Sequence, residues 1–409
     1  MISGALAVLL VVAGCTSPAG GGACSGQPPG CGSAQATAQS LAGFTWSAAP
    51  APPLSPRLAQ ASVWTGTELL IWGGMPDSQG LTEAGDGAAY DPATRAWTPM
   101  PASPLSPRNT AFAVWTRTRA LFWGGGNGSA VPLTDGASYD PASRTWAMLP
   151  AAPLRPDAEG RQAIVWTGTQ MTVIQPEGGA AFNPAASSWT TVPALPQAAG
   201  WQPFAIGAEW AGSAVITWVV SRRPTVNGVI PSGFRFSAYS WWPGSPAWTS
   251  VPGLPNDAAF PSGTAASIGG RLLFLAGTGC GPGASCPART SVGGVWFDPS
   301  SGTWTSLPEK FSGGFGPAVW TGSAMVVFNT RAGATPGPPN RPLGIPAGAA
   351  AAFDPSTGAW TDLARCPIPD LANASLAWTG RQLIVVTMDG EAGSTPQVQV
   401  LSRPTRNSK

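Results

Sequence analysis

The sequence contains no histidine, and only 10% of its 409 residues are charged. Without imidazole, the chain cannot form a Ser-His-Asp triad or a copper or zinc centre built on histidine ligands. Its net charge of +2 comes without a run of basic residues, which argues against nucleic acid as a partner. The N-terminal apolar run, residues 2–14, is shorter than the roughly 20 residues that a membrane-spanning helix needs.

Glycine (53), proline (45) and tryptophan (20) are abundant, and Gly and Pro fall at turn positions between apolar runs rather than in a featureless tract. A phrase in which Asp or Asn, followed by Pro, precedes Trp by six residues recurs about every fifty residues. Its five copies are Asp91 to Trp97, Asp140 to Trp146, Asn183 to Trp189, Asp298 to Trp304 and Asp354 to Trp360. A period of this length is typical of propellers and solenoids.

Each repeat contains four short runs with β-strand character. In the first repeat they are Ala61–Trp64, Glu68–Trp72, Ala88–Tyr90 and Arg95–Thr98. Asp91-Pro92 joins the third run to the fourth, since an Asx side chain accepts a nearby backbone N–H while Pro fixes φ at the next position. Four strands punctuated in this way predict one blade of a β-propeller.

The order of these motifs resembles the kelch repeat. Pro56-Arg57 and Pro107-Arg108 precede Trp64 and Trp115, and the second run ends in Gly73-Gly74 or Gly124-Gly125. The resemblance covers residues 44 to about 403, although the Gly-Gly pair is lost in later repeats and Trp241-Trp242-Pro243 replaces the Asp-Pro turn of the fourth. It implies an all-β, kelch-type propeller with four antiparallel strands per blade.

Seven blades are predicted from the first-run positions, which are Trp64, Trp115, Trp166, Trp210, Ile268, Trp320 and Trp378. The tryptophan of the fourth run is missing after the last of these, but Trp46 stands in the same context near the N-terminus. We therefore expect the strand around Trp46 to complete the seventh blade and close the ring, which removes open sheet edges.

The sequence Val12-Ala13-Gly14-Cys15 resembles a bacterial lipobox, although Met1-Ile2-Ser3 lacks the usual basic residue. The resemblance implies a signal peptide (residues 1–14), a lipid on Cys15, a flexible tether (15–43) and a propeller (44–409). The expected protein is exported and held to the membrane by its lipid alone. The alternative is an ordinary secretory signal that is cleaved without lipidation.

Six cysteines fit an exported protein. Cys24 with Cys31, and Cys280 with Cys286, are candidate local disulfides, while Cys366 is either free or paired with Cys280 or Cys286. We expect no metal, because the cysteine spacing is irregular, and no cofactor.

Candidate site residues lie where the blades differ, on the rim formed by the second-to-third-strand loops and the connections between blades. One half of this rim is acidic and includes Asp77, Asp86, Asp135 and Glu177, whereas the other half is basic and includes Arg222 and Arg223. The connections add Arg57, Arg108, Arg155, Arg161 and Trp201. As ligand-binding candidates we take Arg57, Arg108, Arg161, Asp77, Asp86 and Trp201. The alternatives are that the arginines brace their own loops and that Trp201 covers the apolar top of a blade.

The leading hypothesis is a monomeric, non-enzymatic propeller at the cell envelope that binds a protein or a glycan on one rim. The rival hypothesis is a carbohydrate-active enzyme, epimerase-like or glycosidase-like, that uses rim carboxylates and arginines. No spacing of the carboxylates singles out a catalytic pair. A third possibility is a structural envelope protein with no discrete site.

Overall fold

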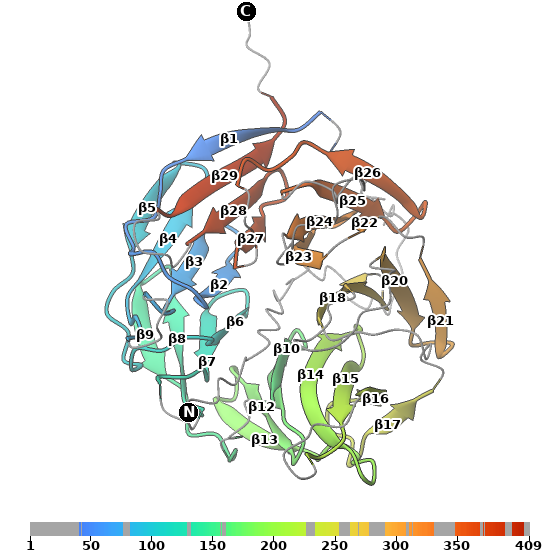
Figure 1. The fold of residues 1–409 in the computed structure, drawn as a ribbon. Helices are drawn as coiled ribbons and strands as arrows, with labels where there is room; N and C mark the ends of the chain where they lie inside the picture. Colours follow the sequence, from blue (N-terminus) through green and yellow to red (C-terminus); the bar gives the residue numbers. More distant parts are fainter. Residues whose placement is uncertain are drawn as a thin grey trace, which may run out of the picture.

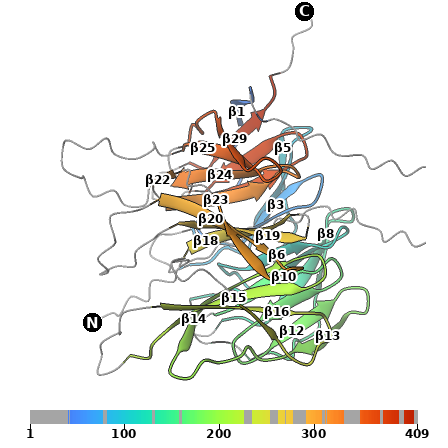
Figure 2. The same cartoon turned by 90° about the vertical axis from the view of Figure 1, so that its right-hand side faces the viewer.

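The protein is an all-β ring, seen along its axis in Figure 1 and from the side in Figure 2, in a computed structural model. The structure describes residues 41, 43–76, 82–128, 132–155, 157, 161–225, 234–252, 262–268, 270–277, 291–307, 311–312, 314–330, 348–368, 371, 373–388 and 395–404. These residues form seven antiparallel sheets, which are the blades of a seven-bladed β-propeller.

The first three blades are the most regular. Blade 1 consists of β2 (Ala61–Trp64), β3 (Leu69–Trp72), β4 (Gly87–Asp91) and β5 (Ala96–Pro99). Blade 2 consists of β6 (Phe112–Trp115), β7 (Ala120–Trp123), β8 (Gly136–Asp140) and β9 (Thr145–Met148). Blade 3 consists of β10 (Ala163–Trp166), β11 (Met171–Ile174), β12 (Gly179–Asn183) and β13 (Ser188–Val192).

The next three blades have longer inner strands. Blade 4 consists of β14 (Gln202–Trp210), β15 (Val215–Arg222), β16 (Phe234–Trp241) and β17 (Thr249–Val251). Blade 5 consists of β18 (Ser262–Ile268), β19 (Arg271–Gly277), β20 (Ser291–Asp298) and β21 (Thr303–Ser306), with β22 (Phe311–Ser312) paired to β20. Blade 6 consists of β23 (Gly314–Trp320), β24 (Met325–Thr330), β25 (Ala350–Asp354) and β26 (Ala359–Leu363).

Blade 7 draws its strands from both ends of the described chain. It consists of β27 (Ser375–Trp378), β28 (Leu383–Thr387), β29 (Gln397–Ser402) and, outermost, β1 (Thr45–Ala49). Thr45 lies opposite Ser402 and Trp46 opposite Leu401. The predicted closure of the ring by the segment around Trp46 is thus confirmed.

The hydrophobic core is divided among the interfaces between neighbouring blades. Each interface has one cluster of buried side chains, and at six of the seven interfaces the inner strands meet in a recurring pair. For example, Val63 of β2 shares a cluster with Trp115 of β6, and Val114 of β6 shares the next with Trp166 of β10. The first-strand tryptophans are therefore part of the scaffold.

The Asx-Pro turns have the geometry that their sequence predicts. The backbone N–H of Ala93 donates to Asp91 Oδ1 at 2.8 Å, and the equivalent bonds form at Asp140, Asn183, Asp298 and Asp354. Each turn then places one residue at positive φ, namely Arg95, Arg144, Ser187, Gly302 and Gly358. The repeated Asx residues are thus fully accounted for by turn formation.

In six of the seven blades, the outer-strand tryptophan binds its blade to the one before it. The indole N–H of Trp97 donates to the carbonyl of Pro50 at 2.8 Å, and that of Trp146 donates to Pro101 at 3.0 Å. The same bond is made by Trp46, Trp189, Trp248 and Trp304 to Ala364, Pro150, Pro193 and Pro252. Apart from Trp46, these rings also stack on the third strand of their own blade, as in the Tyr90–Trp97 pair with centroids 5.0 Å apart.

In blades 4 and 5, the strand register shows which residues are equivalent to those of the regular blades. In blade 5, Ser267 lies opposite Leu272, the position that Trp64 occupies opposite Leu69, so the expected equivalence of Ile268 is wrong by one residue. In blade 4, Trp241 is 2% exposed and pairs with Val215, as Tyr90 pairs with Leu69. Trp241 thus takes the place of the aromatic residue of the regular third strand.

Candidate binding rim

The second-to-third-strand loops and the inter-blade connections share one rim of the ring, which we call the arginine rim. Arg57 stands in the connection that leads to β2, and Asp86 stands directly before β4 in the neighbouring loop. Their side chains form an ion pair of 2.7 Å. The rim residues that the sequence places together therefore do meet in the structure.

Arg57 is a buried structural residue. Its side chain is 1% exposed, and all five of its N–H donors are used. The guanidinium donates to both oxygens of Asp86, to the carbonyls of Ser55 and Gly73, and to Ser55 Oγ. No donor remains for a ligand.

Arg108 repeats this arrangement one blade further on. Its side chain is 0% exposed, and it donates to both oxygens of Asp135, to the carbonyls of Ser106 and Gly124, and to Ser106 Oγ. The bracing alternative thus describes both arginines. We call these two groups the arginine locks.

The Gly-Gly pairs allow the locked loops to approach the second strand. Gly125 has φ of +94°, and a Cβ there would lie 2.4 Å from the carbonyl oxygen of Asn109. Gly73 similarly faces the carbonyl oxygen of Arg108, at 2.7 Å. The Gly-Gly pairs thus occur in the same two blades, 1 and 2, as the arginine locks.

The lock also affects the titration of its carboxylate. Burial alone raises the pKa of Asp86, but the hydrogen bonds and positive charge of Arg57 outweigh this effect, and the net result is a lowered pKa. Asp86 is therefore held as a carboxylate, although its side chain is 60% exposed.

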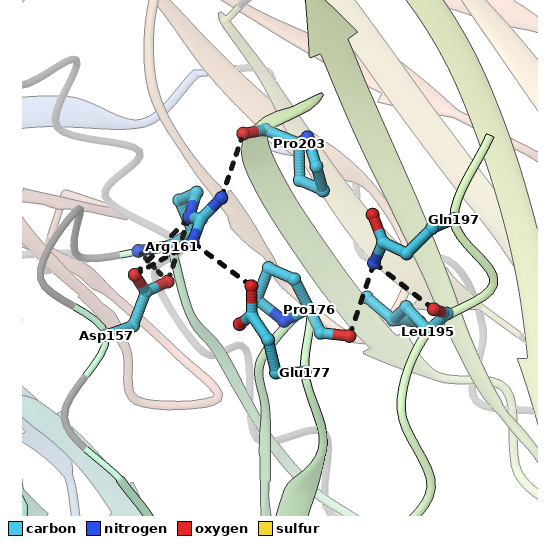
Figure 3. A network of polar contacts seen from close by, with 7 residues as sticks. All are labelled: Asp157, Arg161, Pro176, Glu177, Leu195, Gln197 and Pro203. Atoms are coloured by element: carbon cyan, nitrogen blue, oxygen red, sulfur yellow. Dashed lines mark hydrogen bonds and ion pairs between the residues drawn. The ribbon is translucent and has the colours of Figure 1, made fainter. Parts of the chain in front are cut away.

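In blade 3 the arginine of the rim is differently placed. Arg161 lies next to Asp157, with Nε 3.0 Å from Oδ2, and it also reaches Glu177 at 3.4 Å (Figure 3). A third contact, of 3.5 Å, runs from its guanidinium to the carbonyl of Pro203 at the start of β14. Arg161 therefore links blade 3 to blade 4, and it is partly exposed at 14%.

At the adjoining end of blade 4, two arginines lie over aromatic rings. The guanidinium carbon of Arg222 is 5.0 Å from the centre of Phe204, and that of Arg223 is 5.4 Å from the centre of Trp201. Arg223 is exposed, while Trp201 and Phe204 are half-buried. Within the described part of the chain, neither arginine has an ion-pair partner.

These residues lie close to one another at the junction of blades 3 and 4. Pro203, which Arg161 contacts, directly precedes Phe204 and lies opposite Ser221, the neighbour of Arg222. We call Arg161, Trp201, Phe204, Arg222 and Arg223 the blade 3–4 surface. Of the ligand-binding candidates from the sequence, it contains Arg161 and Trp201, whereas Arg57, Arg108 and Asp86 belong to the locks.

The remaining candidates lie largely outside the described residues. These are Asp77, the lipidation candidate Cys15, and the disulfide candidates Cys24, Cys31, Cys280 and Cys286. Cys366 is a free thiol, 2% exposed, and burial raises its pKa to about 11 despite a backbone hydrogen bond from Ile368. Such a thiol is largely protonated at neutral pH and is a poor nucleophile.

Sequence reasoning missed one buried acid. Glu209 of β14 is 8% exposed, and burial raises its pKa to about 8, although the backbone N–H of Trp210 opposes the shift. The signal was present in the sequence, because the residue before the first-strand tryptophan is Val63, Val114, Val165, Val319 or Ala377 elsewhere. A glutamate at this position is therefore an anomaly of blade 4.

No protein-family model matches this chain, and a comparison with curated proteins found no match either. In the part of the chain that the structure describes, no three His, Cys, Asp or Glu side chains gather as a metal site would require. The same part has no helix with the length and apolar character of a membrane span.

Proposed function

We propose that this chain is an exported, kelch-type propeller that is anchored by a lipid on Cys15 and binds an acidic protein or glycan through the blade 3–4 surface. The observation that carries the proposal is the pair of arginines, Arg222 and Arg223, held over aromatic rings without an acidic partner among the described residues. The regular blades use their rim arginines internally, whereas Arg222 and Arg223 of blade 4 have no such ion pair among the described residues.

The chemistry of the surface suits a carboxylate or phosphate. A guanidinium is planar and binds these groups through two parallel hydrogen bonds, and an aromatic ring beneath it limits its motion without using its donors. Arginine and tryptophan are also the residues most enriched in binding hot spots. The neighbouring Glu177, 72% exposed, pairs with Arg161 and leaves Arg222 and Arg223 as the main attraction for an anion.

Binding is tested with polygalacturonate as an acidic glycan, polyglutamate as an acidic peptide and dextran as a neutral glycan. We expect one acidic polymer to bind saturably, more weakly at high salt, and at least tenfold more weakly to an Arg222→Ala/Arg223→Ala variant. Titration calorimetry on the purified protein measures this.

The matched variant is Arg117→Ala/Arg119→Ala, which removes the same charge from two exposed arginines in the β6–β7 turn on the opposite rim. Equal losses in the two double variants would point to net charge rather than to a site. Failure of both acidic polymers to bind would overturn the proposal.

The lipid anchor has a separate test. In a bacterial host, the wild-type protein should sediment with membranes and incorporate labelled fatty acid, and a Cys15→Ala variant should do neither. A wild-type protein that stays in the soluble fraction without label would instead support the ordinary secretory signal.

The alternative function is carbohydrate chemistry. Glu209 favours it, because a carboxyl group with a pKa of about 8 is poised as a general acid. However, glycoside hydrolysis needs a second carboxylate nearby, and Glu209 is the sole acidic residue in β14, β15, β18 and β19. Glycan turnover that is lost in Glu209→Gln would establish this alternative.

A further inference from the structure

At six of the seven blade interfaces, the inner strands meet in the same way. A small apolar residue of one blade shares a cluster with the first-strand tryptophan of the next blade. The pairs are Val63 with Trp115, Val114 with Trp166, Val165 with Trp210, Ala266 with Trp320, Val319 with Trp378, and Ala377 with Trp64.

The interface between blades 4 and 5 changes both members of the pair. Glu209 stands opposite Ile216 on β15, the register position of Val63 opposite Leu70. Ser267 stands opposite Leu272 on β19, the register position of the missing tryptophan. A larger, ionisable side chain on one blade thus coincides with a much smaller one on the next.

The two side chains share one apolar interface. Ile216 and Trp218 belong to the same cluster as Ala265, Leu272 and Phe274, so the face of β14 that carries Glu209 looks toward the face of β18 that carries Ser267. None of these cluster residues is charged. Glu209 is 8% exposed and has no ion-pair partner among the described residues.

The nearest elements offer no compensating charge. Besides Glu209, the strands β14, β15, β18 and β19 contain two charged residues, Arg222 and Arg271. Arg222 lies at the other end of the hairpin, opposite Gln202, while Arg271 lies opposite Ile268, over Trp296 and 3.5 Å from Asp298. On β16, Arg235 pairs with Ser221 and is exposed.

We propose that Glu209 and Ser267 make the interface between blades 4 and 5 a proton-sensitive seam, which is tight when the carboxyl group is protonated and weakened when it ionises. The neutral carboxyl takes the place of a valine at low cost, but an ionised one in an apolar cluster without a cation is strongly unfavourable.

The direction of the pH effect follows from the buried state. Desolvation raises the pKa of Glu209 from 4.5 to about 8, so the folded protein keeps a proton that the unfolded chain releases above about pH 4.5. This stabilisation is complete below pH 4.5 and is lost progressively as the pH rises to about 8. The folded-to-unfolded ratio should fall by up to about a thousandfold across this window.

The experiment compares the wild type with Glu209→Gln, which keeps the shape of the side chain but does not titrate. Thermal and urea unfolding of the full chain are followed from pH 5 to pH 9. We expect the wild-type midpoint to fall by several degrees relative to that of Glu209→Gln between pH 5 and pH 8. Glu177→Gln, which removes an exposed carboxylate, should retain the wild-type slope.

A second set of variants tests the pairing of Glu209 with Ser267. Restoring the regular pair in Glu209→Val/Ser267→Trp should give a stable protein without the pH slope. Ser267→Trp alone should be destabilised, because the indole meets the larger Glu209, and the two changes should therefore be non-additive.

Hydrogen exchange locates the effect. After correction for the intrinsic pH dependence of exchange, peptides from β14 and β18 should lose protection between pH 5 and pH 8 more than peptides from β6 and β10. Identical pH profiles for the wild type and Glu209→Gln, or additive effects of the two substitutions, would overturn the proposal.

Discussion

Blades 1 and 2 differ from blade 4 in how their rim arginines and their inner strands are built, although all three follow the same repeat. In the first two blades, each rim arginine is buried and all its donors are satisfied within the loops, and the inner strand carries Val next to Trp. In blade 4 the rim arginines lie over aromatic rings without an acid among the described residues, and the inner strand carries Glu209. The regular blades thus use their charged rim groups within the fold, whereas the corresponding groups of blade 4 have no charged partner among the described residues.

The largest expected loss of stability comes from removing one of the arginine locks of blades 1 and 2. Arg108→Ala leaves five bonds unmade and a buried gap, so we expect a loss of about 3 kcal/mol in the free energy of unfolding. Urea denaturation measures it. Arg223→Ala, on the exposed surface of blade 4, should change stability by less than about 0.5 kcal/mol. Similar losses at both positions would mean that the lock is not special.

Two glycine substitutions separate the stability cost of a steric clash from the cost of a positive φ. Gly125 and Gly212 have similar φ, +94° and +84°, but a Cβ at Gly212 meets nothing within 4 Å. We expect Gly212→Ala to cost about 1 kcal/mol from the positive φ alone, and Gly125→Ala to cost about 2 kcal/mol more because its Cβ collides with Asn109. Thermal unfolding should therefore rank them in that order.

The outer tryptophans provide a smaller effect. Trp146→Phe keeps the ring near Tyr139 but removes the N–H that donates to Pro101, and we expect a loss of about 1 kcal/mol. Trp242, 45% exposed on blade 4, should tolerate the same substitution without a measurable change in the urea midpoint. If Trp146→Phe also left the urea midpoint unchanged, ring stacking alone would explain the contribution of the outer-strand tryptophan to stability.

The last effect is of similar size at neutral pH but depends on pH. Asp86→Asn should lower stability by about 1 kcal/mol at pH 7, because Arg57 loses a charged acceptor. The Asp86 pKa is lowered in the folded protein, so its contribution is complete above its ordinary pKa of 3.8 and is lost as the pH falls below that value. Urea midpoints of wild type and variant should converge toward pH 3, whereas a constant difference would exclude the ionised lock.

Much of the architecture could be predicted because it depends on local, repeated chemistry. The Asx-Pro turn needs one side chain and one nearby N–H, so Asp91 and its equivalents reveal it directly. Trp46 showed the closure of the ring, since its context matches that of Trp97. Blade 5 was misaligned by one residue because Ser267 has none of the bulk by which the other first strands are found.

The candidate site was harder to predict because charge alone does not show whether an arginine is used. Arg57 and Arg223 both belong to rim segments, yet one is 1% exposed with five bonds and the other is exposed over Trp201. Only their burial and their contacts in the folded structure distinguish them. Glu209 escaped notice for a different reason: the search for function followed the loops, and this residue lies within a strand.

The closure of blade 7 by β1 also determines how the ring responds to tension. Tension on the chain before Thr45 first meets Leu41 and Phe44, which are buried between blades 6 and 7, and then the five residues of β1 that pair antiparallel with β29. Because Thr45 lies opposite Ser402, tension between the two ends of the described ring would separate these pairs one after another from that end. If a lipid on Cys15 holds the protein at a moving membrane, the strand that completes the fold is also the strand that would detach first under tension.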